Sequence, residues 1–358
     1  MKNTILIHGR EVGAGQPAYI IAEMSGNHNQ SYEKAVEIIY AMKDAGADAV
    51  KIQTYTADTI TLKSDRPEFQ IGGGTLWDGK TLHDLYSEAF TPWEWQPKLK
   101  AVAEDLGMDL FSTPFDASSV EFLESMDVPA YKIASFEIVD IPLIRKVAAT
   151  GKPIIISTGM ASRSEIEDAL EAAKGCEVAL LKCTSAYPAR PESMNLNTIP
   201  AMIKDFHVPV GLSDHTLDNA AAVTAVRLGA CIIEKHFKLD QNECGPDSTF
   251  SLDPQAFRSM VDVIRAAEHG KNMEPLDPVI LGSAQYGPSP EEKKSMQFRR
   301  SLFVVKDIAE GETFTNENVR SIRPANGLAP AHYDRVLGRK ATKRIERGTP
   351  LREDCIAS

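Results

Sequence analysis

Eight short apolar segments, each followed by a stretch with helical periodicity, constrain the fold of this chain more than any other feature. The expected strands are 19–22, 49–52, 109–111, 130–133, 154–156, 178–181, 210–212 and 231–233. Short, fully apolar runs are typical of parallel strands that are buried on both faces. Eight strand–helix units in about 250 residues favour an α/β fold of the (β/α)8 type, a TIM barrel. A doubly wound open sheet is the main alternative.

The segments between the strands carry helix signals. Residues 31–45 and 164–173 repeat apolar residues at helical spacing, and Asp253 and Pro254 precede a third expected helix, 255–269. An acceptor or a proline at the start is a typical helix boundary. The stretch 54–90, which contains three consecutive glycines, is instead expected to be an extended loop on the functional face.

The composition changes near residue 275. We expect a barrel domain at 1–273, a proline-rich linker at 274–296 and a small β-rich domain at 297–358. The last domain contains an internal repeat, in which 306–311 matches 343–348 at an offset of 37 residues. Each copy is expected to form a short strand, a glycine turn and a return. Two such copies predict pseudo-twofold symmetry.

The formal net charge of −11 disfavours a binder of nucleic acid or of anionic membrane surfaces, because these partners need a positive field. Residues 297–358 nevertheless carry a net charge of +4, so a basic lobe can place an arginine over an anionic ligand. The five cysteines show no paired spacing, which favours free thiols in a reducing compartment. No apolar run reaches bilayer length and no signal-peptide pattern is present, so we expect a cytoplasmic protein.

Polar or ionisable residues follow every expected strand. In a barrel these residues meet at the C-terminal ends of the strands, where the chemistry of this fold sits. A lone lysine at such a position usually extends its amine into water. Lys51 and Lys132 together, with hydroxyls from separate strands, instead predict a cradle for a phosphate or a carboxylate. These hydroxyls belong to Thr113, Ser157, Thr184 and Ser213.

His215 and His236 follow two adjacent expected strands, 21 residues apart. Neighbouring strands lie about 4.8 Å apart, so both imidazoles can reach one divalent metal ion. The alternative is two ordinary histidines with local hydrogen bonds. With no obvious third ligand, the pair predicts an open site in which water and substrate complete the coordination. Asp214 and Glu234 are expected to orient the two rings.

Three carboxylates are candidate acid–base groups, namely Glu23, Glu137 and Asp247. A lone carboxylate is usually solvated surface, but Glu23 lies at a strand end beside both predicted sites. Most tryptophans are expected to serve in packing. Trp77, which follows the glycine run, stays a candidate for stacking on a ligand.

Several motifs, taken in order along nearly the whole chain, resemble the sialic acid synthase family. They are Ile21-Ala22-Glu23, residues 46–54, Ser112-Thr113-Pro114-Phe115, residues 131–135, Ser157-Thr158-Gly159-Met160, residues 211–215, Glu234-Lys235-His236-Phe237 and Gly245-Pro246-Asp247. The C-terminal repeat resembles the antifreeze-like (SAF) domain of that family, including Ile322-Arg323-Pro324. Residues 53–56, 74–80, 85–86 and 91–95 resemble the pseudaminic acid synthases within the family.

The resemblance implies an enzyme, a transferase that condenses phosphoenolpyruvate with an amino-sugar aldehyde to give a nine-carbon 2-keto acid. For the pseudaminic acid branch the sugar is 2,4-diacetamido-2,4,6-trideoxy-L-altrose, and phosphate is released. Family members hold a divalent metal, commonly Mn2+, with Mg2+ or Co2+ as alternatives. They are typically domain-swapped homodimers.

The resemblance also assigns roles to the candidate residues. Positions matching Lys51, Thr113, Lys132, Ser157 and Ser213 hold phosphoenolpyruvate, and those matching His215 and His236 bind the metal and are catalytic. Glu23 is expected to be catalytic. The sugar is expected to contact Gln53, Glu137, Tyr187, Asp247 and Arg323, the last of these lent by the partner subunit.

Three other functions stay open. An N-acetylneuraminate or legionaminate synthase would perform the same chemistry on a different hexosamine. A metal-dependent aldolase or sugar isomerase on the same barrel would release no phosphate. A non-catalytic sugar-binding protein would bind without turnover, although it would have no need of acids, bases and an open metal site at the strand ends.

Overall fold

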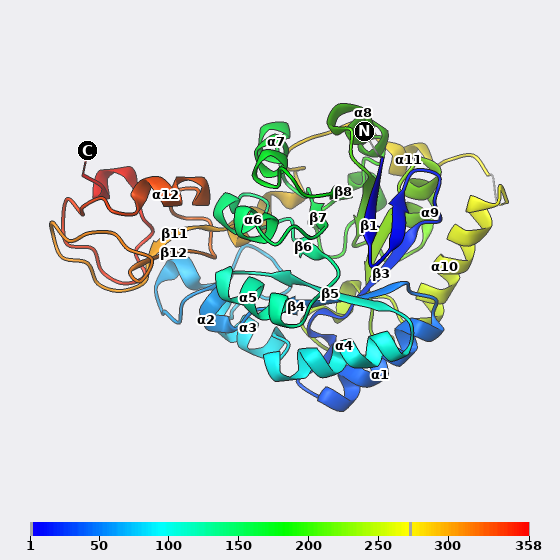
Figure 1. The fold of residues 1–358 in the computed structure, drawn as a ribbon, viewed down its shortest axis with the longest axis horizontal. Coiled ribbons are helices and arrows are strands. Elements are labelled where there is room, and N and C mark those ends of the chain that lie inside the picture. The colour runs from blue at the N-terminus through cyan, green and yellow to red at the C-terminus, as the bar shows by residue number, and fades with distance from the viewer. Residues whose placement is uncertain (1–2, 272–273, 358) are drawn as a thin grey trace.

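The computed structural model describes residues 3–271 and 274–357 and shows a closed barrel of eight parallel strands with a small lobe at one side (Figure 1). The barrel order is β10-β3-β4-β5-β6-β7-β8-β9. The strands are β3 (Tyr19–Glu23), β4 (Ala49–Thr54), β5 (Asp109–Pro114), β6 (Tyr131–Ile133), β7 (Ile154–Ser157), β8 (Val178–Cys183), β9 (Val210–Asp214) and β10 (Ile232–His236). The TIM barrel predicted from the apolar runs is therefore confirmed, and the open sheet is excluded.

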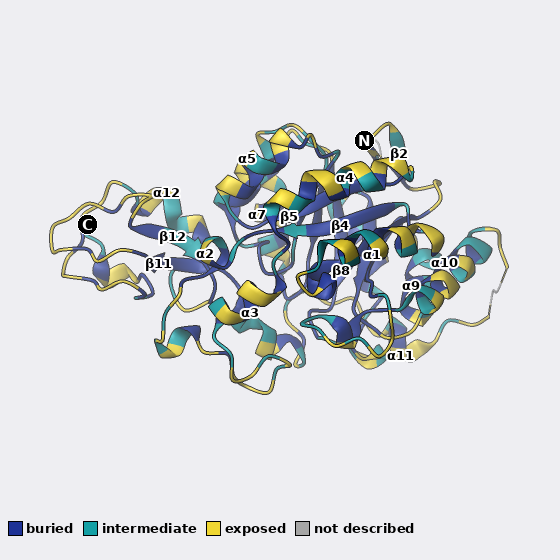
Figure 2. Cartoon of the chain, turned by 90° about the horizontal axis from the view of Figure 1, so that it is seen from below, coloured by how far each residue is buried: buried dark blue, intermediate teal, exposed yellow. Residues whose placement is uncertain are grey.

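Eight helices follow the barrel strands and surround them. They are α1 (Tyr32–Asp44), α4 (Gln96–Asp105), α5 (Ala117–Ser125), α6 (Ile141–Ala148), α7 (Arg163–Ala172), α8 (Thr198–Phe206), α9 (Ala220–Arg227) and α10 (Pro254–Glu268). Side chains cap several of them: Ser31, Asp116, Ser162 and Asp253 each accept a hydrogen bond from a backbone N–H in the first helical turn. The helices bury one face against the strands, as Figure 2 shows.

A hairpin of β1 (Thr4–Ile7) and β2 (Arg10–Gly13) closes the N-terminal end of the barrel. Ile5, Ile7 and Val12 are buried in the barrel core. Arg10 donates a hydrogen bond to Asp48 at 2.7 Å, next to the start of β4. This end is therefore sealed, and the chemistry is confined to the opposite end.

The segment between β4 and α4 differs from the expected loop. It contains two helices, α2 (Ala57–Ile60) and α3 (Leu82–Ala89), and only the part around the glycine run is extended. Thr81 caps α3 by accepting a hydrogen bond from the N–H of Asp84. Further along the chain, α11 (Pro278–Leu281) lies within the expected linker 274–296. The expected barrel boundary at residue 273 lies outside the described residues.

The C-terminal lobe contains β11 (Ser301–Val304), β12 (Val319–Ile322) and α12 (Tyr333–Val336). Its repeat is symmetric in the backbone hydrogen bonds. Ile308 pairs with Ile345, its equivalent in the other copy. The N–H of Gly311 bonds to the carbonyl of Ala341, and the N–H of Gly348 bonds to the carbonyl of Val304, both at 2.8 Å. Each bond maps onto the other by the offset of 37, so the predicted pseudo-twofold relation is present.

Besides the barrel core and the lobe's own core, a separate apolar cluster lies between the lobe and the barrel mouth. It joins three parts of the chain: the 55–86 segment, the barrel mouth and the lobe. Its members include Tyr55, Phe69, Leu85, Phe115, Phe136, Phe298, Phe303 and Ile322. We call this cluster the joint core. It fixes the lobe over the C-terminal ends of the strands.

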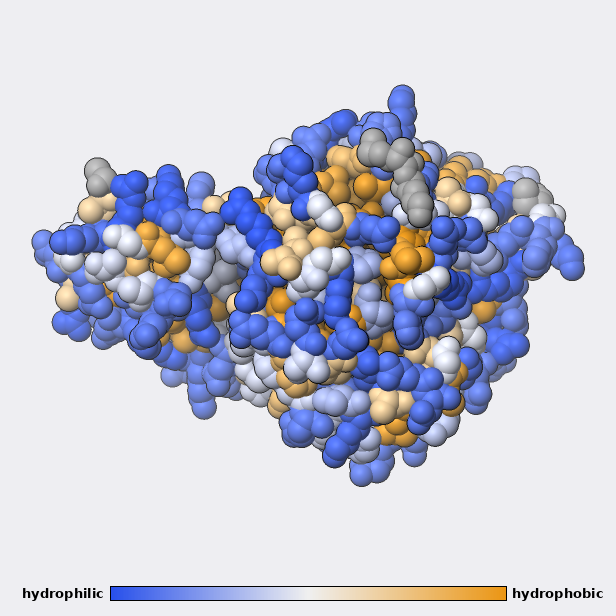
Figure 3. Space-filling view, in the orientation of Figure 1, coloured by the Kyte–Doolittle hydropathy of each residue, from blue (hydrophilic) through white to orange (hydrophobic). Residues whose placement is uncertain are grey.

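None of the described helices is both long enough and apolar enough to cross a bilayer. The face drawn in Figure 3 is mostly hydrophilic, and its larger hydrophobic areas lie over the barrel body.

Candidate active site

A cavity lies at the C-terminal ends of the barrel strands, beneath the joint core. Residues from the strands, from the 55–89 segment and from the lobe line it together. Of the residues predicted from the sequence, the cavity brings together Lys51, Gln53, Thr113, Lys132, Ser157, Tyr187, Ser213, His215, His236, Asp247 and Arg323. Glu23 and Glu137 are fully buried and lie outside this lining.

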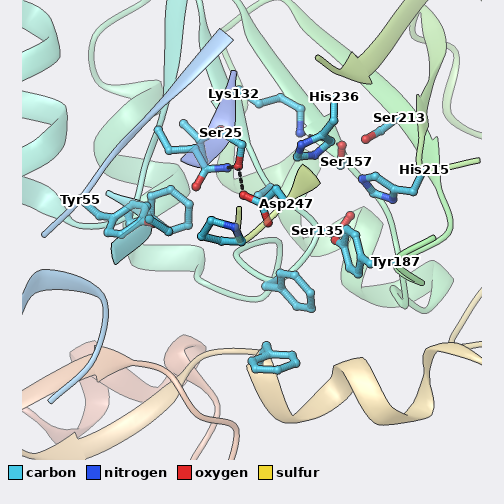
Figure 4. A pocket seen from close by; sticks show the side chains of 18 of the residues that line it. Ser25, Tyr55, Lys132, Ser135, Ser157, Tyr187, Ser213, His215, His236 and Asp247 are labelled. Carbon is cyan, nitrogen blue, oxygen red and sulfur yellow. Dashed lines mark hydrogen bonds between the residues drawn. The ribbon is translucent and has the colours of Figure 1, made fainter. Parts of the chain in front are cut away.

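Strand register explains why these groups meet. The pairing of β10 with β3 sets His236 beside Glu23, and the pairing of β3 with β4 sets Glu23 beside Lys51. In each strand alternate residues point into the barrel. Figure 4 shows the result: Lys132, Ser157, Ser213, His215 and His236, from four strands and the loop after β9, face one space.

The two lysines differ in how they are held. Lys51 Nζ lies 2.6 Å from Glu23 Oε2 and 3.7 Å from Glu234 Oε1. Burial alone would lower the pKa of Lys51, but these two carboxylates outweigh it and raise that pKa. Lys132 Nζ donates to Ser157 Oγ at 2.6 Å, and Glu234 is its nearest carboxylate at 3.9 Å. Burial therefore dominates at Lys132 and lowers its pKa.

Unpaired polar atoms surround the two ammonium groups. Thr113 Oγ1 and Glu234 Oε2 are buried without a hydrogen-bond partner among the described residues. Buried polar atoms are nearly always paired, so these two indicate where a polar ligand sits. Two ammonium groups and the hydroxyls of Thr113, Ser157 and Ser213 suit an anion with several oxygens.

The two histidines lie with their ring centroids 5.5 Å apart. His215 donates from Nδ1 to the carbonyl of Thr184 at 2.9 Å, which leaves Nε2 with its lone pair free. His236 Nδ1 is buried and has no hydrogen-bond partner in the described parts of the chain. Burial together with the neighbouring His215 lowers the pKa of His236 well below its usual value. Two imidazoles with unpaired nitrogens fit a divalent metal ion.

A closed metal cage is absent from the described part of the chain, where no three His, Cys, Asp or Glu side chains gather around one point. The two histidines therefore fit an open site, in which other ligands come from water or substrate.

Asp247 and Gln53 are joined by a residue that the sequence did not single out. Ser25 contacts both side chains, and Gln53 Nε2 also donates to Glu23 Oε1 at 2.9 Å. Burial raises the pKa of Glu23, an effect that Lys51 partly offsets. Glu23 therefore contacts the cavity lining through Lys51 and Gln53.

Aromatic rings form one wall of the cavity. The Tyr187 ring lies 4.4 Å from the His215 ring, and Phe136 stacks on Tyr187 at 6.4 Å. Trp77 meets Phe298 edge to face at 5.5 Å, and Trp77 Nε1 donates to the carbonyl of Pro246. We call Trp77, Phe136, Tyr187 and Phe298 the aromatic wall. Sequence reasoning missed two of them, Phe136 and Phe298, because loop aromatics have no periodicity.

Arg323 comes from the lobe of the same chain. Its guanidinium donates to Glu137 Oε1 at 2.8 and 3.1 Å and to the Tyr86 hydroxyl at 3.0 Å, and it lies 4.7 Å from the Phe136 ring centroid. Glu137 also accepts from Arg300 at 3.1 Å. Glu137 was predicted to contact the sugar, but here its Oε1 is engaged by two arginines behind the wall.

The expected roles of Asp214 and Glu234 were wrong. Asp214 forms a fully buried ion pair with Lys235 at 2.5 Å and caps the turn at Thr216. It points away from the histidines because it alternates with Ser213 and His215 along the chain. Glu234 does line the cavity, but it accepts from Ser213 and stands between Lys51 and Lys132.

The comparison with known proteins now decides the family. The NeuB family model matches residues 38–273, and the SAF domain model matches residues 299–357. The chain belongs to the NeuB family. This confirms the family expected from the motifs and places the antifreeze-like repeat in the C-terminal lobe.

Two relatives and one solved structure are similar to this NeuB-family chain over nearly its whole length. The pseudaminic acid synthase of Helicobacter pylori is 44% identical over 95% of this chain and 98% of the relative. The N,N'-diacetyllegionaminic acid synthase of Legionella pneumophila is 35% identical over 95% of this chain and 94% of the relative. The crystal structure of a spore coat polysaccharide biosynthesis protein from Bacillus subtilis superposes with a TM-score of 0.86, at 32% identity, and covers 99% of both chains.

Proposed function

We propose that this chain is a pseudaminic acid synthase, which condenses phosphoenolpyruvate with 2,4-diacetamido-2,4,6-trideoxy-L-altrose and water to give pseudaminic acid and phosphate. The observation that carries this proposal is the meeting of two ammonium groups and two free imidazole nitrogens in one buried cavity. The greater identity to a pseudaminic acid synthase than to a legionaminic acid synthase supports the choice of sugar.

Phosphoenolpyruvate would bind at the lysine end of the cavity. Lys51 and Lys132 supply positive charge for its phosphate and carboxylate, and Thr113, Ser157 and Ser213 supply hydroxyls. Glu234 separates the two ammonium groups, and with Glu23 it keeps Lys51 charged. Because the site is buried, these charges interact with the anion more strongly than they would in water.

The sugar would place its aldehyde at the histidines and its far end at the aromatic wall. A divalent ion held by His215 and His236, such as Mn2+, Mg2+ or Co2+, would supply Lewis-acid polarisation of the aldehyde oxygen. The aromatic wall suits the methyl groups of a trideoxy sugar with two acetamido substituents. Polar contacts to the sugar would come from Gln53, Asp247 and Arg323.

The reaction then balances as follows. The methylene carbon of phosphoenolpyruvate forms a bond to the aldehyde carbon, which leaves positive character on the adjacent carbon. Water adds to that carbon; one of its protons ends on the former aldehyde oxygen, which becomes a hydroxyl, and the other on the departing phosphate. The C–O bond to phosphate breaks, and phosphate leaves with the bridging oxygen. Glu23 influences these reaction steps through Lys51 and Gln53, the two cavity residues that it contacts.

Product analysis tests the proposal. The protein is incubated with Mn2+, phosphoenolpyruvate labelled with 18O at the bridging oxygen, and in parallel the hexosamines of the pseudaminate, legionaminate and N-acetylneuraminate synthases. We expect phosphate and a nine-carbon keto acid, most rapidly with the altrose derivative, and the 18O label in the phosphate. Faster turnover of another hexosamine would reassign the substrate. Sugar binding without phosphate release would indicate a non-catalytic protein.

The assembly is a separate question. Family resemblance predicts a domain-swapped homodimer in which Arg323 is lent by the partner, whereas in this structure Arg323 of the same chain lines the cavity. Mixing a His236→Gln protein with an Arg323→Ala protein separates the two arrangements. An exchanged lobe restores part of the activity in the mixture, because one site then receives both intact groups. An own-chain lobe restores none.

A further inference from the structure

Ser25 occupies a backbone conformation that is unfavourable for serine. Its φ is +48°, in the left-handed region, and the residue is buried in the turn after β3. Residues other than glycine, asparagine and aspartate rarely adopt this conformation, because Cβ crowds the backbone. Glycine would adopt it without strain. A residue with a strained backbone whose side chain lines the cavity calls for an explanation from the chemistry of that side chain.

The hydroxyl of Ser25 connects two residues of the site. Gln53 Nε2 lies 3.0 Å from Ser25 Oγ, and since an amide nitrogen only donates, Ser25 accepts this bond. The single hydroxyl hydrogen is then available for Asp247 Oδ2, the contact drawn as a dashed line in Figure 4. The direction of both hydrogen bonds is thus fixed by the donor chemistry of Gln53.

These bonds orient the Asp247 carboxylate. The N–H of Gly26 also donates to Oδ2, at 3.3 Å, so both donors approach the same oxygen. Within the described residues no donor binds Oδ1, and Asp247 lines the cavity. The carboxylate is therefore held by one oxygen and presents the other to whatever occupies the cavity.

We propose that Ser25 is a positioning residue, which holds the Asp247 carboxylate toward the sugar, and that the turn keeps a strained serine for the sake of this hydroxyl. The inference rests on the proposed function, because it gives Asp247 a substrate to meet. The competing explanation is that Ser25 only fastens the turn after β3 to the loop that carries Asp247. The two explanations make opposite predictions about stability and catalysis.

Two variants separate the hydroxyl from the backbone. Ser25→Gly removes both the hydroxyl and the strain, whereas Ser25→Ala removes the hydroxyl and keeps the strain. We expect both to lower kcat with the sugar by roughly 10-fold to 100-fold, the effect of losing a hydrogen bond to a charged group. The KM for phosphoenolpyruvate should stay within about twofold in both variants, since Ser25 has no hydrogen bond to Lys51 or Lys132.

Melting temperatures provide the readout that a fastening role would change. The Ser25→Gly protein should melt at or above the wild-type temperature, and the Ser25→Ala protein should melt below Ser25→Gly. A fall in the melting temperature of Ser25→Gly with unchanged kcat would overturn the proposal and show that Ser25 only holds the turn to the loop that carries Asp247.

A double-mutant cycle tests whether Ser25 acts through Asp247. In an Asp247→Asn background, Ser25→Gly should lower kcat by less than about threefold, because the group that it positions is already impaired. Fully additive effects would refute this route. Wild-type protein that releases no phosphate would refute the proposed function itself, whereas active wild type with equally active Ser25→Gly would refute only the role of Ser25.

Discussion

The two lysines of the cavity should respond to the same substitution in different ways. Lys51→Met removes the only cation within 4 Å of Glu23 in the described structure, and Glu23 is fully buried. Gln53 would remain as its hydrogen-bond partner. Removing one member of a buried ion pair costs about 3–5 kcal/mol, because a buried charge is left uncompensated. Lys51→Met should therefore destabilise the fold as well as weaken substrate binding.

Lys132→Met should weaken binding without this loss. Among the described residues, Lys132 has no carboxylate within hydrogen-bond distance: its hydrogen bonds go to Ser157 and to the carbonyl of Ile133, and Glu234 lies 3.9 Å away. Glu234 keeps Lys51 as its neighbour when Lys132 is removed. Burial of the Lys132 ammonium is itself unfavourable, so its replacement by an apolar group of similar length should cost little stability.

The magnitudes can be compared in one experiment. An unfolding entropy of roughly 2.1 cal/mol/K per residue gives about 0.75 kcal/mol/K for 358 residues. The cost at Lys51 then corresponds to a fall in Tm of about 4–7 °C, against about 0–2 °C at Lys132. Each variant should raise the KM for phosphoenolpyruvate roughly 10-fold to 100-fold, since each loses a charge-assisted hydrogen bond.

Calorimetry and steady-state kinetics on the wild type and both variants provide the measurements. Glu23→Gln combined with Lys51→Met is the matched control, because it removes the uncompensated charge and should recover most of the lost Tm. Equal falls in Tm for Lys51→Met and Lys132→Met, or no recovery in the double variant, would refute the reasoning.

Three further predictions concern neighbouring groups. Chelation of divalent metal should abolish turnover, and added Mn2+ should restore wild type but not His236→Gln, with Mn2+ binding followed by electron paramagnetic resonance. Glu234 raises the pKa of Lys132 against the effect of burial, so Glu234→Gln should lower that pKa further. The KM for phosphoenolpyruvate, which rises at alkaline pH as Lys132 loses its proton, should then begin to rise at lower pH. An unchanged pH profile of this KM would contradict the prediction. Arg323→Met should raise the KM for the sugar. It should lower the free energy of unfolding by less than about 3 kcal/mol, because Arg300 remains beside Glu137. A larger loss of unfolding free energy in chemical denaturation would show that Arg300 does not compensate.

The barrel could be predicted from the sequence because its signal is repeated. Every predicted strand is a short apolar run, and the observed strands begin within one residue of the predicted positions. Helix α3 was missed although Thr81 and Asp84 formed a capping signal, because the nearby glycine run dominated the interpretation of 54–90. The hairpin of β1 and β2 was also missed, because it lies before the first strand–helix unit of the repeated pattern.

The site could be predicted where it depends on strand ends, and not where it depends on loops. Alternation along β10 would have placed Glu234 on the same side as His236, and the same rule would have excluded Asp214 from the cavity. The hydrogen bonds of Ser25 depend on a loop that follows β10, more than 200 residues away, which no local pattern specifies. The approach of Arg323 to Glu137 depends likewise on how the lobe docks.

The joint core has a consequence for how family members can be recombined. Glu137 belongs to the barrel, yet both cations that neutralise it, Arg300 and Arg323, belong to the C-terminal lobe. Without the lobe, the Glu137 carboxylate of the barrel would have no neutralising cation and would lie beneath exposed aromatic rings. A chimaera that paired this barrel with a foreign lobe would inherit the same defect unless the incoming partner carried matching arginines and a matching apolar face. The two modules are therefore expected to be inherited as a unit.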